Sequence, residues 1–194
     1  MAATAEGGGN LRLWLGSVPL PGHGGDHAAT TGPTWVRRRA AASGRAQRLE
    51  CPAKAPLPEH TRGMDADDVL RTLELEPHPE GGHYRETWSD EACSAIYFLL
   101  RTGERSRWHR VRDRVEIWHF YAGSPLRLEV DLEGAGTAAA QDIELGRDLR
   151  AGQRPQAVVP AGAWQSACTL GPWTLVGCTV APPFTFDAFD LAPQ

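Results

Sequence analysis

From residue 79 onward, the hydrophobic positions of the chain fall in short segments rich in β-branched and aromatic residues. Gly, Pro, Asp or Ser separates most of these segments, which is typical of β-strands joined by turns. The expected strands are residues 82–88, 93–101, 105–111, 115–123, 126–132, 141–146, 156–160, 164–170 and 173–180. About nine closely spaced strands predict an all-β domain built as a sandwich or a barrel.

One helix is expected before the strands. Met64 is followed by several acidic residues and then by Val69, Leu70 and Leu73 at helical spacing. Acidic side chains are favourable in the first turn of a helix because of its dipole. The pattern therefore predicts one short N-terminal helix and a single folded domain that spans residues 64–194.

Residues 1–63 have no amphipathic period and are rich in Gly, Ala, Thr and Pro. A segment with so few large apolar residues cannot offset the entropy lost on ordering, so a disordered extension is expected. Two origins stay open. The abundance of Arg and Ala resembles an organellar transit peptide, whereas a domain start at Met64 indicates a start codon assigned too far upstream.

The formal net charge of −4 at pH 7 is divided unevenly along the chain. Residues 1–63 contain eight basic and four acidic residues, giving +4, and the rest contain 12 basic and 20 acidic residues, giving −8. This acidic domain offers no argument for nucleic-acid binding, and no apolar run approaches the ~20 residues that span a bilayer. Lys54 is the only lysine. The domain therefore lacks the side chain needed for Schiff-base chemistry or a lysine-containing phosphate loop.

Three cysteines of the domain, Cys93, Cys168 and Cys178, lie within expected strands. Their odd number and strand positions predict small buried hydrophobes in a reducing compartment, not a disulfide framework or a zinc site. We therefore expect a cytoplasmic protein, or an organellar one if residues 1–63 are a transit peptide.

His109 and Glu116 are candidate site residues because they fall on two adjacent expected strands that form a hairpin. Side chains alternate along a strand. The positions expected to share the inner faces of this hairpin are Arg107, His109, Val111, Glu116, Trp118 and Phe120. A His and a Glu that face each other in an aromatic cavity can bind a metal, form an acid–base pair or only hold the barrel through a hydrogen bond. These three interpretations stay open.

The spacing around this pair resembles the first motif of the cupin superfamily. That motif is Gly, five residues, His-x-His, three or four residues, Glu, six residues and Gly. Gly103, His109, Glu116 and Gly123 match its positions, and Val111 replaces its second His.

The second cupin motif is matched in part by residues 152–169, with Gln165 at its His position and Thr169 at its Asn position. Longer stretches resemble one uncharacterised branch of the cupins, made of dimeric jelly-roll barrels. These stretches are PHPEGG at 77–82, YRET at 84–87, WHRV at 108–111 and EIWHFYAGSPL at 116–126. The resemblance covers about residues 69–191. It implies a double-stranded β-helix, the jelly-roll cupin barrel, and a homodimer.

A typical metal-binding cupin holds its ion with three His and one Glu, so the resemblance implies a metal position at His109, Glu116 and Gln165. Val111 cannot ligate, and a carboxamide is a weak ligand. This set is poor for transition metals, which favour three or four good donors. We expect no certain cofactor and at most weak binding of a divalent metal such as Mn, Fe or Zn.

Without a metal, the same pair suits proton transfer, because a histidine pKa lies near neutral pH. Isomerases and epimerases of sugar nucleotides use such groups on the cupin fold. We therefore expect a small polar metabolite in the barrel and isomerase- or epimerase-like chemistry at His109 and Glu116. The alternatives are a non-catalytic ligand-binding or sensor cupin and a weakly metal-dependent cupin enzyme.

The residues expected to bind the ligand are Arg85, Trp118, Phe120, Trp164 and Gln165. Arg85 is expected to contact an anionic group such as a carboxylate or phosphate. Trp164 is expected to stack on a sugar or base ring.

Overall fold

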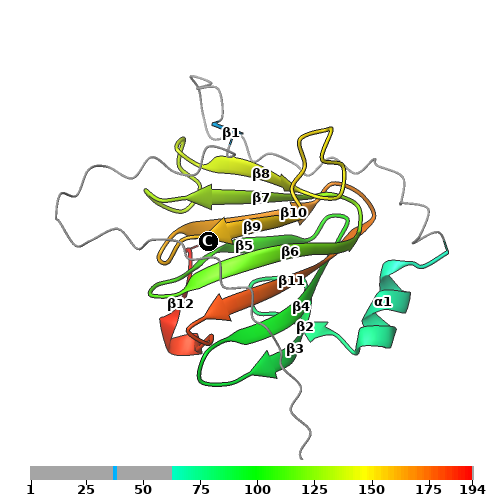
Figure 1. Cartoon of the computed structure of the whole chain (residues 1–194), viewed down its shortest axis with the longest axis horizontal. Helices are drawn as coiled ribbons and strands as arrows, with labels where there is room; N and C mark the ends of the chain where they lie inside the picture. The colour runs from blue at the N-terminus through cyan, green and yellow to red at the C-terminus, as the bar shows by residue number, and fades with distance from the viewer. Residues whose placement is uncertain (1–36, 39–62, 194) are drawn as a thin grey trace, which may run out of the picture. The chain divides into compact units, whose positions relative to one another are not determined.

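The computed structural model describes residues 37–38 and 63–193, which contain two six-stranded antiparallel β-sheets (Figure 1). The prediction of a disordered extension over residues 1–63 falls almost entirely outside the described residues. The first sheet has the order β1 (Arg37–Arg38), β8 (Gln141–Leu145), β7 (Leu126–Asp131), β10 (Trp164–Thr169), β5 (Arg105–Val111) and β12 (Phe189–Leu191). The second has the order β2 (Glu76–Pro77), β3 (His83–Ser89), β4 (Ser94–Arg101), β11 (Trp173–Ala181), β6 (Val115–Gly123) and β9 (Gln156–Val159).

Strands distant in sequence lie side by side within each sheet. β11 separates β4 from β6, and β10 separates β5 from β7. This interleaving is the topology of a jelly roll, in which successive strands alternate between two sheets. The predicted all-β, double-stranded β-helix fold is confirmed.

The hydrophobic core lies between the two sheets. Phe98 of β4 and Trp118 of β6 belong to the same buried cluster as Leu128 of β7 and Leu145 of β8. Each of these side chains is at most 1% exposed. Burial of such side chains from both sheets provides the main stabilisation of the barrel.

One short helix, α1 (Ala66–Leu73), precedes the strands, as the sequence predicts. Asp65 caps its N-terminus by accepting the backbone N–H of Asp68 at 2.8 Å, and Asp68 returns the contact to the N–H of Asp65 at 3.1 Å. This capping box satisfies backbone donors that a helix start leaves unpaired. Val69 then packs against residues of β4 and β11.

The cysteine prediction is confirmed in part. Cys93 and Cys178 are free thiols, and Cys178 is buried. Cys168 is disulfide-bonded, so the prediction is wrong for this residue. The prediction relies on the odd number of cysteines after residue 63, but the whole chain contains four cysteines, an even number.

Among the described residues, no helix has both the length and the apolar character needed to span a membrane.

Candidate functional site

A cavity of about 200 Å³ lies at the end of the barrel where β4 and β6 begin and β5 and β11 end. Its polar lining includes His78, Glu80, Glu86, His109 and Glu116. Its apolar lining includes Phe98, Val111, Phe184, Phe186 and Phe189. The two candidate residues from the sequence, His109 and Glu116, thus face one cavity.

β5 carries His109 into this cavity, where its side chain is 2% exposed. Its Nδ1 lies 2.8 Å from the backbone carbonyl oxygen of Arg107. Because a carbonyl oxygen only accepts, Nδ1 carries the proton and Nε2 carries a lone pair. Burial lowers the pKa of His109, against the opposing effect of Glu116 and Arg107, so the ring is neutral near pH 7.

Glu80 reaches the cavity from the turn between β2 and β3. The next residue, Gly81, has φ +107°, and a Cβ there would lie 2.4 Å from the backbone oxygen of Arg105. Only glycine fits such an approach without strain. The N–H of Arg107 also donates to the carbonyl oxygen of Glu80 at 2.7 Å. These contacts fix the turn against β5 and leave Glu80 6% exposed beside His109.

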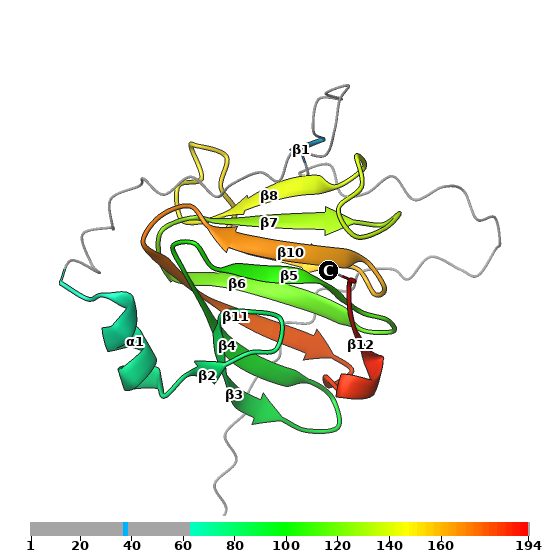
Figure 2. The ribbon, with the colours of Figure 1, turned by 180° about the vertical axis from the view of Figure 1, so that it is seen from behind.

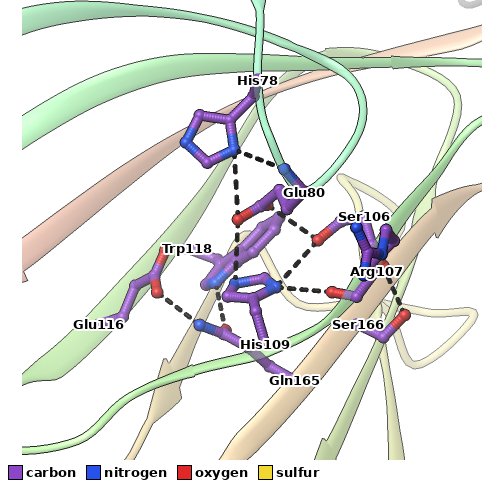
Figure 3. Close-up of polar contacts among 9 residues, drawn as sticks. All are labelled: His78, Glu80, Ser106, Arg107, His109, Glu116, Trp118, Gln165 and Ser166. Atoms are coloured by element: carbon purple, nitrogen blue, oxygen red, sulfur yellow. Dashed lines mark hydrogen bonds and ion pairs between the residues drawn. The ribbon is translucent and has the colours of Figure 1, made fainter. Parts of the chain in front are cut away.

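Glu80, His78 and His109 form a polar cluster (Figure 3). Oε2 of Glu80 lies 3.4 Å from Nε2 of His109 and 3.4 Å from Nδ1 of His78. Nδ1 of His78 accepts the backbone N–H of Glu80 at 3.3 Å, so this nitrogen also carries a lone pair. Ser106 donates its hydroxyl proton to the other oxygen, Oε1, at 2.8 Å. A carboxylate oxygen that faces two lone pairs is repelled by both, so a single proton on the carboxyl group, donated to one of the two nitrogens, is favourable.

The pKa shifts in this cluster agree with a proton on the carboxyl group and none added to the imidazoles. Burial raises the pKa of Glu80 to about 8, against the opposing hydrogen bond from Ser106. Burial, together with the neighbouring His109, lowers the pKa of His78 to about 4. Near pH 7 the cluster therefore holds its proton on Glu80 and keeps both imidazoles neutral.

Ser106 occupies the inner face of β5 that the sequence assigns to Arg107. In the pairing with β10, Gln165 lies opposite His109 and Ala167 lies opposite Ser106, so β5 has one extra residue between them. Such a bulge reverses the alternation of side chains. The prediction that Arg107 shares a face with His109 is therefore wrong.

Glu116 enters the cavity from β6 with a separate set of partners and is 7% exposed. Its Oε2 accepts a hydrogen bond from Nε2 of Gln165 at 2.5 Å, and the thiol of Cys178 also donates to the carboxyl group. Burial raises the pKa of Glu116, and the electrostatic interaction with His109 opposes this rise. Among the described hydrogen bonds, none joins His109 to Glu116. The two residues belong to separate networks that face the same cavity.

Three phenylalanines of the C-terminal segment form an apolar wall of the cavity. The ring of Phe184 lies 5.2 Å from that of Phe186 and 5.6 Å from that of Phe189. β12 pairs with β5 along this segment (Figure 2). Asp190 of β12 also accepts a hydrogen bond from Nε of Arg110 at 2.8 Å. The wall is thus attached to the strand that carries His109.

Three residues predicted to bind the ligand are not in the described lining of the cavity. Gln165 is 1% exposed, and its Oε1 accepts the indole N–H of Trp118 at 2.9 Å. Trp118 is 1% exposed, and Phe120 packs against the hydrophobic core. Gln165 and Trp118 therefore act on the site by holding Glu116.

The other two predicted ligand-binding residues lie elsewhere. Trp164 is half-buried, and the guanidinium of Arg110 lies 4.8 Å from its ring centroid, within cation–π distance. Arg85 is exposed and forms an ion pair with Glu74, just after α1. Neither residue belongs to the described lining of the cavity.

The residues at the cupin metal positions do not fit a metal ion. Val111 has no donor atom, and the oxygen of Gln165 is already bound by Trp118. His109 and Glu116 alone are fewer than the three or four donors that transition metals favour. Among the described residues, no group of three or more His, Cys, Asp or Glu side chains is arranged to hold a metal.

The sequence interpretation misses the roles of His78, Glu80 and Ser106. The His-Pro-Glu-Gly-Gly run fits a tight turn, which accounts for its glycines without a site. A His and a Glu within one loop are the available signal, because loops often carry functional residues. The contact of this loop with β5 depends on residues far along the chain, so no local pattern indicates it.

The comparisons with known proteins agree with this architecture. Residues 67–192 match the model of a family described as "Cupin superfamily (DUF985)". A crystal structure of a Shewanella oneidensis protein is 43% identical over 68% of this chain and 86% of that chain, with a TM-score of 0.61. A hypothetical protein from Leishmania major is 27% identical over 68% of this chain and 89% of that chain, with a TM-score of 0.62. None of the curated proteins matches. Because the family match covers more than half of its residues, the chain belongs to the cupin superfamily, in the family DUF985.

Proposed function

We propose that this cupin binds a small polar metabolite in its cavity and moves protons to and from it, as an isomerase or epimerase does. The observation that carries the proposal is that two largely buried imidazoles and two buried carboxyl groups face one cavity, those of His78, His109, Glu80 and Glu116. Burying ionisable groups is costly, and shifted pKa values at such clusters are typical of active sites.

The networks support a division of roles. Neutral His109 offers the lone pair of Nε2 as the base that removes a proton, and the carboxyl group of Glu80 lies 3.4 Å from that nitrogen. Glu116 faces the same cavity with a pKa raised by burial, so it is suited to hold a proton and return it to the substrate. An isomerisation needs one group that removes a proton and another that returns one elsewhere.

The cavity limits the substrate. A volume of about 200 Å³ is below the roughly 300–1,000 Å³ that holds drug-sized ligands. No Arg or Lys is among the described residues that line it. A complete sugar nucleotide is therefore too large and too anionic, and the proposal concerns a molecule of the size of a sugar or smaller.

The alternative is a non-catalytic ligand-binding or sensor cupin. The observation in its favour is the rigid hydrogen-bonded chain from Trp118 through Gln165 to Glu116, which fixes the carboxylate as a binding group. Weakly metal-dependent chemistry has no comparable support, because Val111 has no donor atom and Gln165 is not among the described residues that line the cavity.

The test joins binding with proton exchange. The full chain is screened by thermal shift against sugars, hydroxyaldehydes, hydroxyketones and amino alcohols, and any ligand found is incubated with the protein in D2O. Exchange of a C–H proton, detected by NMR, is expected for the native protein and is expected to be lost in His109→Ala and Glu116→Gln. Glu91→Gln, an exposed change outside the cavity, is the control. Binding without exchange would identify the sensor alternative, and absence of any binding would overturn the proposal.

We also propose that the chain forms a homodimer. Val115 and Tyr121 of β6 are 38% and 49% exposed, and Val158 of the adjacent strand β9 is 38% exposed. Exposed apolar side chains near a sheet edge favour association. Light scattering coupled to gel filtration is expected to give twice the chain mass, and Tyr121→Glu with Val158→Glu is expected to give the monomer. A native monomer would contradict this proposal.

A further inference from the structure

The described lining of the cavity contains acidic side chains but neither Arg nor Lys. Glu80, Glu86 and Glu116 face the cavity, and Glu80 holds a proton near pH 7. His78 and His109 are neutral near pH 7, because burial lowers the pKa of each. An anionic ligand would lose its hydration here without meeting a cationic partner.

Glu116 is buried without a counter-charge. It is 7% exposed, and its hydrogen-bond donors are a neutral carboxamide and a neutral thiol, from Gln165 and Cys178. An ionised carboxylate in such a place is costly unless a positive charge lies nearby. A cationic ligand in the cavity would provide that charge.

The apolar part of the lining suits the same kind of ligand. Phe184, Phe186 and Phe189 form a cluster of rings with centroids 5.2 to 6.4 Å apart, and Phe98 also lines the cavity. Faces of aromatic rings attract cations, and rings that surround a methylated ammonium group are a recurrent way to bind it. Here the rings and the carboxyl groups line the same small space.

We infer that the cavity selects a small organic cation, with an ammonium group held among the phenylalanine rings and near Glu116. This inference rests on the proposed function, since it names the ligand class of the same cavity. Glu86 is exposed and lines the cavity as well, so its carboxylate attracts cations toward the entrance. The small volume restricts the ligand to molecules of about the size of choline or a simple amino alcohol.

Three probes of similar shape and different charge test this inference: choline, its neutral carbon analogue 3,3-dimethylbutan-1-ol, and the anion 3,3-dimethylbutanoate. Isothermal titration of the full chain is expected to show choline binding at least about tenfold tighter than the alcohol, since a cation gains from both carboxylate and rings. The anion is expected not to bind. Glu116→Gln is expected to reduce the affinity for choline to that for the alcohol, while Glu91→Gln leaves it unchanged.

Two further variants separate the contribution of charge to choline affinity from that of the aromatic rings. Neither variant alters the buried hydrogen bonds of Glu116. Phe186 is 62% exposed, so Phe186→Leu is expected to fold normally. It is expected to weaken choline binding roughly threefold or more, with less than about a twofold change for the alcohol, because only the cation interacts with the ring face. Glu86→Gln is expected to weaken choline binding about twofold at low salt and less at high salt.

The outcomes distinguish this inference from the proposed function. Equal affinity for choline and the alcohol, or preference for the anion, would overturn the inference. If a sugar or hydroxyketone binds and no cation does, the inference is wrong while the proposed binding function stands. If no ligand of any class binds, both are wrong.

Discussion

Two walls of the cavity hold their carboxyl groups in different ways. On the β5 side, Glu80 faces a lone pair on each of two imidazoles, and Ser106 donates to its other oxygen. On the β6 side, Glu116 receives hydrogen bonds from the amide of Gln165 and the thiol of Cys178. Imidazoles exchange protons near neutral pH, whereas an amide only donates its hydrogen bond.

Burial raises the pKa of both acids, but different partners oppose that rise. For Glu80, whose pKa rises to about 8, the opposing contact is the hydrogen bond from Ser106. For Glu116, the interaction with His109 and the hydrogen bonds from Gln165 and Cys178 oppose the rise. The two buried carboxyl groups thus depend on separate networks. The predictions below test this contrast.

Gln165→Leu is expected to have the largest effect, on the β6 wall. It leaves the buried indole N–H of Trp118 unpaired and removes the amide hydrogen bond to Glu116, which keeps Cys178 as a donor. An unpaired buried group costs about 1–3 kcal/mol and a lost hydrogen bond about 0.5–1.5 kcal/mol, so the free energy of unfolding is expected to fall by about 2–4 kcal/mol. Urea denaturation measures this. Gln156→Leu, at an exposed position of β9, is the control and is expected to change little. A loss as small as that of the control would show that the Gln165 bridge does not hold this wall.

Glu80→Gln is expected to remove a pH dependence that belongs to the β5 wall. The pKa of Glu80 rises from 4.5 to about 8 on folding, so between these values the folded state binds the extra proton and stability falls as pH rises. The pKa of His78 falls from 6.5 to about 4, so stability rises with pH between about 4 and 6.5. The two slopes oppose each other below pH 6.5, and the decline from Glu80 is expected between pH 6.5 and 8.

Thermal unfolding between pH 6.5 and 8 measures this difference. The Tm of the native protein and of the exposed control Glu91→Gln is expected to fall over this interval, and that of Glu80→Gln is expected to fall clearly less, because only the raised pKa of Glu116 then contributes to the decline. An unchanged decline in Glu80→Gln would mean that the proton of this wall is held elsewhere.

Ser106→Ala is expected to have a smaller effect on the same wall. It removes one hydrogen bond to Glu80, at a cost of about 1 kcal/mol. That hydrogen bond lowers the pKa of Glu80, so its loss is expected to raise this pKa further and extend the decline in Tm to higher pH. Ser89→Ala, on the exposed end of β3, is the control. A pH profile identical to the native one would show that Ser106 does not influence the proton on Glu80.

The strands of both walls are predictable from local pattern. The expected segments 105–111 and 115–123 coincide with β5 and β6, because alternation and β-branched or aromatic residues are properties of neighbours in the chain. The short strands β2 and β12 are not predicted. They contain two and three residues, too few for a period, and they exist through pairing with β3 and β5.

The residues of the site also differ in whether local sequence pattern predicts their positions. The hairpin spacing is sufficient to bring His109 and Glu116 to one cavity. The inward position of Ser106 follows from a bulge that depends on pairing with β10, about 60 residues later in the chain. Glu80 enters the site because Gly81 packs on the backbone of β5, which is likewise a long-range contact. Local sequence pattern thus predicts the β6 wall, which carries Glu116, better than the β5 wall, against which Glu80 lies.

Added metal ions are expected to have the smallest effect, because neither wall offers enough free donors. Val111 contributes none and Gln165 is occupied, so Mn²⁺, Fe²⁺ or Zn²⁺ is expected to shift the Tm of untagged native protein by less than about 1 °C. Val111→His adds a third strong donor near His109 and Glu116, on the inner face of β5. With excess Zn²⁺, this variant is expected to gain several degrees, since a ligand that binds only the folded state stabilises it by mass action. A stoichiometric ion in the untagged native protein, or an equal shift in both proteins, would show that His109 and Glu116 already share a metal, and the contrast between the walls would then need another explanation.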